Sequence, residues 1–142
     1  MKNGIKEIYT IEVDYYPETD IPKEMNIRLL TGEFHSPPDG RPSSVEFDDQ
    51  GRPTEMAWHH RNLLHRFSGP AMVRINPENG VHIAEFFRIV VDEEEDVARG
   101  QNELSTIFRD EITGEVKQKM YGGRYSNIKG HTEGLKAPKP IR

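Results

Sequence analysis

The sequence predicts a mainly β fold, an antiparallel sheet built of successive hairpins in meander order, with room for one short helix. Three observations predict it. Short runs in which apolar and polar residues alternate recur along the chain, and a period of two is typical of half-buried strands. Clusters rich in Gly, Pro, Asn and Asp separate these runs, as hairpin turns require. Part of the pattern then recurs further along the chain.

The length and composition predict a single domain with a tail. A chain of 142 residues suits one domain, and we assign residues 1–121 to it. Residues 122–142 contain few apolar side chains and many turn formers. They cannot bury enough surface to offset the entropy of ordering, so we predict a flexible basic tail there.

The first two strands are predicted near the N-terminus. Residues 5–16, IKEIYTIEVDYY, interleave isoleucine, valine and tyrosine with polar residues, and these apolar types favour strands. The two prolines of residues 16–22 then break the run. Residues 25–30, MNIRLL, offer a second strand before the turn-like sequence TGEF. An antiparallel pair is expected.

A hairpin is predicted next. Residues 35–53 hold four prolines and two glycines, and between these turn signals lies SSVEFDD, with Val45 and Phe47 on one face. The sequence DDQGRP turns into TEMAWHH, where Met56 and Trp58 alternate with their neighbours. Two alternating runs that flank a glycine turn indicate a β-hairpin.

The hairpin pattern is repeated. The strand AMVRI, the turn NPENG and the strand VHIAEFFRIVV follow, and they define a repeated region from Phe34 to Arg88. At an offset of 28 residues the matching pairs are Pro42 and Pro70, Val45 and Val73, Phe47 and Ile75, and Trp58 and Phe86. Gly51 matches Gly80 with a slip of one residue, and His35 matches His65 with a slip of two. Such self-similarity indicates stacked supersecondary units.

The last elements are a candidate helix and a further hairpin. DEEEDVARGQNEL, residues 92–104, is the segment that could start a helix, because its acidic run suits a helix N-terminus. Gly100 would end that helix early. STIFRDE and EVKQKMY, on either side of the turn at Gly114, predict the final hairpin.

The stretch from Trp58 to Ala71 carries the most distinctive motif. The residues that define it are Trp58, His65, Arg66, Gly69, Pro70 and Ala71. They resemble a MORN-like repeat, W-x-x-x-G-x-x-H-R-x-x-G-P-A, that recurs in uncharacterised proteins of bacteriophages and large viruses. Asn62 or Leu63 stands where that unit has its first glycine, and Asn62 can adopt the left-handed conformation such a turn needs. The resemblance implies stacked hairpins and a structural or protein-contact role, and it implies no activity.

Composition and charge exclude several classes of site. The chain has no cysteine, which excludes disulfides and thiolate chemistry. No apolar stretch is long enough to span a bilayer, and the N-terminus has no signal-peptide pattern, so we expect a cytoplasmic protein. Residues 1–110 carry 12 Lys and Arg against 21 Asp and Glu, whereas residues 111–142 carry 7 against 3. An acidic body disfavours direct nucleic-acid binding.

The six histidines raise a metal or acid–base alternative. His60 and His65 could converge across a tight turn with Asp39 or Glu55 as a third ligand. A ββα-metal nuclease site would need His60, Asn79 and His82, but the spacing from Asn79 to His82 is too short for it. We favour polar packing and exposed histidines, and expect no metal and no cofactor. The alternative function is a metal-dependent hydrolase or nuclease.

The function we predict is a non-enzymatic module that contacts another protein through an open sheet face or edge. The viral resemblance implies inhibition of a host factor, for example a nucleic-acid-binding enzyme with a basic groove. Membrane binding is not expected, and self-association through sheet edges is a further option. The candidate binding residues are Trp58, His60, His65, Arg66 and Arg74.

Overall fold

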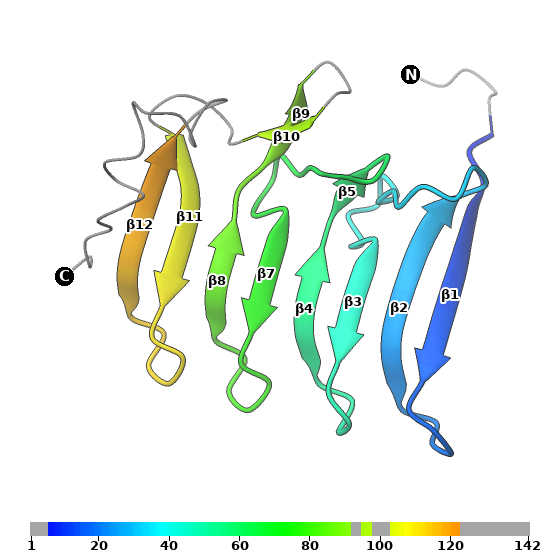
Figure 1. The fold of residues 1–142 in the computed structure, drawn as a ribbon, viewed down its shortest axis with the longest axis horizontal. Coiled ribbons are helices and arrows are strands. Elements are labelled where there is room, and N and C mark those ends of the chain that lie inside the picture. The colour runs from blue at the N-terminus through cyan, green and yellow to red at the C-terminus, as the bar shows by residue number, and fades with distance from the viewer. Residues whose placement is uncertain (1–5, 92–94, 98–102, 123–142) are drawn as a thin grey trace.

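Eight strands form one antiparallel sheet, whose neighbours follow the order of the chain (Figure 1). The computed structural model describes residues 6–91, 95–97 and 103–122. The strands are β1 (Tyr9–Tyr15), β2 (Pro22–Leu29), β3 (Ser44–Phe47), β4 (Pro53–Ala57), β7 (Met72–Ile75), β8 (His82–Phe86), β11 (Glu103–Arg109) and β12 (Val116–Gly122). They pair as four hairpins. The predicted mainly β meander is confirmed.

Two small ribbons lie at the end of the sheet opposite the four hairpin turns (Figure 1). One pairs β5 (His59–His60) with β6 (Leu63–Leu64), and the other pairs β9 (Ile89–Val91) with β10 (Glu95–Val97). Between β5 and β6, Arg61 and Asn62 have φ values of 47° and 74°. A type I′ turn needs positive φ at both central residues, so the left-handed conformation predicted for Asn62 is confirmed.

The expected short helix is wrong where its segment is described. Glu95–Val97 pair with Ile89–Val91 as a ribbon, and no helix occurs among the described residues. The β-branched residues of β9 favour a strand and offer a partner for pairing. This preference exceeds the helix-start preference of the acidic residues. The rest of the candidate helix, residues 92–94 and 98–102, lies outside the described residues. The predicted tail is residues 122–142: Gly122 is the last residue of β12, and the remainder, from residue 123 onward, lies outside the described residues.

Three of the hairpin turns share one design. Gly51, Gly80 and Gly114 have φ values of 84°, 77° and 80°, in the left-handed region that favours glycine. Each turn begins with an Asp or Asn whose side-chain oxygen accepts one or two backbone N–H groups within the turn. The residues are Asp48, Asn76 and Asp110. These side chains hold the turn before the strands pair.

Neighbouring turns are bonded to one another. Asn76 and Asn79 both donate their side-chain amides to the carbonyl of Glu111 in the next turn, at 2.7 and 2.9 Å. At the other side of the sheet, the Tyr16 hydroxyl donates to the Phe47 carbonyl at 2.7 Å. These bonds fix hairpins that are otherwise joined by short strand pairings.

Every junction between hairpins has the same seam. A small, buried residue lies one position before the first residue that pairs across the junction. Its carbonyl accepts the N–H of a larger residue that lies one position after the last residue paired across the junction. The small residues are Ser43, Ala71 and Ser105, exposed by 0%, 0% and 3%. Their donors are Ile27, Trp58 and Phe87. The recurrence of one hydrogen bond at three junctions shows that the hairpins are structurally equivalent.

The backbone equivalence corrects one residue pair predicted from the sequence. The offset of 28 residues pairs Trp58 with Phe86, but Trp58 and Phe87 make the equivalent bonds, to Ala71 and Ser105. The turn explains the slip, because Asp48 bonds to Arg52 whereas Asn76 bonds to Val81, one residue further on. The slip predicted between His35 and His65 agrees with the structure, since their N–H groups donate to the equivalent carbonyls of Ile27 and Trp58.

The core lies along one face of the sheet. Cross-strand pairing aligns Val45 with Met56, and Met56 with Val73, while Trp58 and Ile75 complete the cluster. Val73 is 2% exposed. The opposite face of β1–β4 carries a different row of side chains, which is described next.

Candidate functional site

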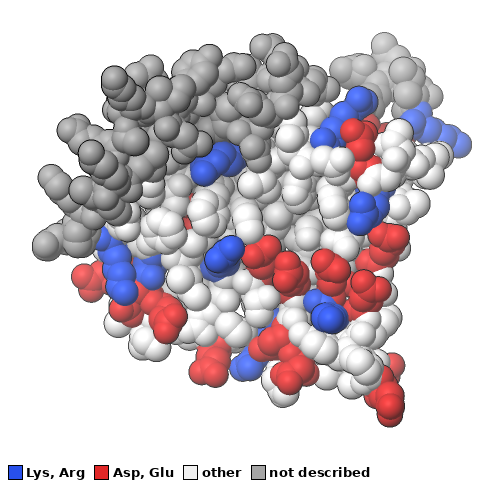
Figure 2. Space-filling view, in the orientation of Figure 1, with Lys and Arg blue, Asp and Glu red and all other residues white. Residues whose placement is uncertain are grey.

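A row of carboxylates crosses the first four strands. Asp14 pairs with Glu24, Glu24 with Glu46, and Glu46 with Glu55, so the four residues share one face and stand directly opposite their neighbours. Directly opposed side chains in a sheet lie about 5 Å apart. We call Asp14, Glu24, Glu46 and Glu55 the acidic row. Figure 2 shows acidic side chains gathered over β1–β4.

Arg74 ends the acidic row. It pairs with Glu55 across β4 and β7, and its Nε atom lies 3.6 Å from Glu55 Oε1. One guanidinium therefore lies at the end of a row of four carboxylates, and the row keeps a net negative charge. Burial, followed by the neighbouring charge of Glu46, raises the pKa of Glu55, and Arg74 only partly opposes this. The row is electrostatically strained, since like charges directly opposite each other destabilise a sheet.

Replacing Glu55 with glutamine is expected to stabilise the protein at pH 7 by about 0.2–1 kcal/mol. The folded-state pKa of Glu55 lies above its ordinary value, so its cost is present at neutral pH and fades as pH falls through that folded-state pKa. Urea unfolding at pH 7 and pH 3.5 measures the effect. The control is Glu78→Gln at an exposed turn, expected to change little at either pH. A gain from Glu55→Gln that persists at pH 3.5 would contradict the account.

A second cluster, of histidine and aromatic rings, lies at the ribbon end of the sheet. Successive ring centroids are 6.1 Å apart for Tyr9 and His35, 4.9 Å for His35 and His60, 5.7 Å for His60 and His65, and 4.8 Å for His65 and Phe67. We call these five residues the ring row. It joins β1 to the β5–β6 ribbon.

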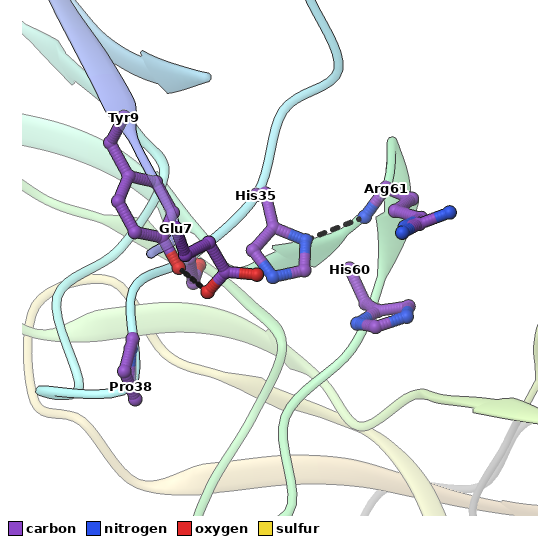
Figure 3. A pocket seen from close by; sticks show the side chains of 7 residues that line it. Glu7, Tyr9, His35, Pro38, His60 and Arg61 are labelled. Atoms are coloured by element: carbon purple, nitrogen blue, oxygen red, sulfur yellow. Dashed lines mark hydrogen bonds between the residues drawn. The ribbon is translucent and has the colours of Figure 1, made fainter. Parts of the chain in front are cut away.

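A shallow hollow of about 300 Å³ opens beside the ring row, lined by Glu7, Tyr9, His35, Ser36, Pro38, His60 and Arg61. Figure 3 shows the Glu7 carboxylate between the Tyr9 hydroxyl and the His35 ring. The hydroxyl donates to that carboxylate. Burial and then the bond to Glu7 raise the pKa of Tyr9, so the phenol stays protonated.

Two imidazoles of the ring row are held by backbone donors. His35 Nδ1 accepts the N–H of Arg61 at 3.2 Å, and His65 Nδ1 accepts the N–H of Val90 at 2.9 Å. Because a backbone N–H only donates, both Nδ1 atoms are unprotonated. Burial, then the nearby His60, lowers the pKa of His35, against opposing effects of Glu7 and Glu33. Anchored in this way, the two rings serve as equivalent packing elements of successive units.

The structure brings the residues of the metal alternative together only in part. His60 and His65 are in ring contact, but Asp39 pairs with Arg41 at 2.8 Å and Glu55 pairs with Arg74. Within residues 6–91, 95–97 and 103–122, no group of three or more His, Asp and Glu side chains is placed to hold a metal ion. Nothing in this geometry favours the alternative.

Trp58 and Arg66 form a structural unit. The Arg66 guanidinium lies 3.8 Å from the centre of the Trp58 ring, and the indole N–H donates to the Gly40 carbonyl at 2.9 Å. A Cβ atom at Gly69 would lie 3.1 Å from Arg66 Nη1, so a side chain there would require the guanidinium to shift slightly. Trp58 is only 8% exposed. The candidate binding residues therefore separate into the core unit of Trp58 and Arg66, the ring row with His60 and His65, and Arg74 at the acidic row.

The structure also contains a serine–histidine pair that the sequence did not indicate. Ser43 Oγ lies 2.6 Å from His59 Nδ1, the distance of a nucleophile and its base. Ser43 is fully buried, however, so no substrate can reach its hydroxyl. The pair serves the hairpin seam rather than catalysis.

The acidic row was also missed at the sequence level. Each of its residues occupies an ordinary polar position of an alternating strand, and only the register between strands aligns them.

The comparisons add no relative from which a role could be transferred: no protein-family model, no curated protein and no solved structure matches the chain. No helix of the described residues has the length and apolarity to cross a membrane.

Proposed function

We propose that this protein is a non-enzymatic interaction module whose acidic row docks against a basic surface of another protein. The row itself carries the proposal: four carboxylates stand in register across β1–β4, and the arginine at the end of the row pairs with Glu55. A basic partner would reduce the repulsion between these carboxylates. The binding free energy would therefore be more favourable by the amount of repulsion removed. Complementary charge also speeds encounter and sets specificity.

The chemistry of the row favours a partner with a flat or grooved basic surface. The carboxylates lie on a sheet face and not in a cleft, so they suit an extended array of Lys and Arg side chains. Surfaces of this kind occur on proteins that bind nucleic-acid phosphates. The resemblance of the Trp58–Ala71 motif to MORN-like units of phage and large-virus proteins supports a host factor of this class as the target, with inhibition as the outcome.

The test compares two variants of the full chain that remove the same charge. In one, Glu24, Glu46 and Glu55 become glutamine, and in the other Asp49, Glu78 and Glu111 at the hairpin turns become the matching amides. Binding to a decalysine peptide at low ionic strength is measured by calorimetry. We expect the first variant to bind at least about tenfold more weakly than the second, a difference of about 1.4 kcal/mol. Equal losses in the two variants would overturn the proposal.

A further inference from the structure

The β12 edge of the sheet has the features of an unfinished hairpin junction. Cross-strand pairing places Met120 opposite Thr106 and Tyr121 opposite Leu104. In the inner hairpins the same positions are filled by Ala57 and Trp58, and by Phe86 and Phe87. Tyr121 thus corresponds to Ile27, Trp58 and Phe87, whose N–H groups each donate to a small residue of the next hairpin.

Tyr121 is more exposed than its equivalents Ile27 and Trp58, as expected where no described hairpin lies next to it. Ile27 and Trp58 are 3% and 8% exposed, because the next hairpin covers them, whereas Tyr121 is 51% exposed. In the sheet order, no described strand lies beyond β12. An edge strand presents unpaired backbone donors and acceptors to an incoming strand. The β12 edge therefore presents the Tyr121 side chain and the Tyr121 backbone N–H, which correspond to the groups that form the inner seams.

The inner junctions also indicate which residue types a strand added to β12 needs. The residue that receives the donor is Ser43, Ala71 or Ser105, and each is almost fully buried, so only a small side chain fits. Lys119 occupies the position of Met25 and Met56, opposite which Val45 and Val73 stand. Lys119 has no carboxylate partner among the described residues, and Lys117 on the same strand is exposed. An acidic residue opposite Lys119 would complete a cross-strand charge pair.

A second copy of this chain fits the edge poorly. The two edge strands of its sheet are β1 and β12. β12 has no acidic residue to place opposite Lys119. In β1, Ile11 pairs directly with Ile27 and occupies the place that Ser43 and its equivalents hold elsewhere. Isoleucine is too large for a seam position that is completely enclosed. The N-terminal edge of the sheet therefore does not reproduce the inner seam, while the β12 edge does.

We infer that the β12 edge binds an extended acidic strand of another protein, which adds to the sheet antiparallel to β12. The strand places a small residue opposite Tyr121 and an acidic residue opposite Lys119. Main-chain hydrogen bonds give such strand addition its affinity, and the alternate side chains give it specificity. The site is distinct from the acidic row, which lies on β1–β4 and has the opposite charge.

The probe is a peptide of residues 41–49, which carry β3, with Val45→Glu so that a carboxylate faces Lys119. The matched control peptide also carries Ser43→Ile. We expect the control to bind the full chain at least about tenfold more weakly. Tyr121→Pro, which removes the outward donor on an edge strand that tolerates proline, and Lys119→Glu should each weaken binding by a similar factor, with thermal unfolding temperatures nearly unchanged. Equal binding of the two peptides would overturn the inference.

Two other candidate occupants of the β12 edge are residues 123–142 of the same chain and a second copy of the chain. Hydrogen exchange and light scattering on the full chain test both. We expect the Tyr121 amide to exchange quickly in the free protein and to become protected when the probe peptide is bound. Protection already present in the free monomer would assign the edge to the chain's own residues 123–142. Concentration-dependent assembly with the same protection would assign it to a second copy. Either result would overturn the assignment to a partner protein.

Discussion

Replacing Trp58 with alanine is expected to lower the free energy of unfolding by about 3–5 kcal/mol. Trp58 packs with Val73 and Ile75 in the core cluster, supports the Arg66 guanidinium and donates its indole N–H to Gly40. Alanine would leave a cavity and remove all three interactions. Urea denaturation of the purified protein measures the loss.

The control for Trp58 is an exposed large side chain. Leu30 is 68% exposed, so Leu30→Ala should change stability by less than about 0.5 kcal/mol. Trp58→Phe should lie between the two, because it keeps a ring for Arg66 and loses the bond to Gly40. A loss below about 1 kcal/mol for Trp58→Ala would contradict the placement of this residue in the core.

Replacing Ala71 with isoleucine is expected to destabilise the protein by about 1–3 kcal/mol or more. Ala71 is 0% exposed and lies at the seam where its carbonyl accepts the Trp58 N–H. Three added carbons would force the second and third hairpins apart. The matched control is Ile11→Ala at the equivalent position of the edge strand, where the side chain is 53% exposed and little change is expected. Thermal unfolding of both variants decides, and equal effects would contradict the seam equivalence.

The strands could be predicted from the sequence because their signals are local. Val45 and Phe47 alternate with polar residues, and Gly51 and Gly80 mark turns that only a left-handed residue makes easily. These cues fix each hairpin without knowledge of its neighbours. The slip between Trp58 and Phe87 escaped for the same reason, because one extra turn residue shifts a backbone register without changing the strand pattern.

The candidate sites depend on long-range register and could be predicted only in part. The Arg66 guanidinium stacks on the Trp58 ring, and both residues belong to the motif that the sequence singles out. The alignment of the four residues of the acidic row requires three strand pairings that no local pattern encodes. The anchoring of His65 by Val90 likewise joins residues from different hairpins. Sequence patterns predict which side chains lie on the exposed face of a strand. The register between paired strands determines which of these side chains contact one another.

The most direct test of the proposed function is to map where a basic ligand binds. Amide chemical shifts of the isotope-labelled full chain are followed while decalysine is added at low ionic strength. The account predicts that the largest shifts lie on β2, β3 and β4 around Glu24, Glu46 and Glu55, and that they diminish as salt is added. Shifts centred instead on the turn residues Asp49, Glu78 and Glu111, or spread evenly over the described surface, would contradict a docking role for the acidic row.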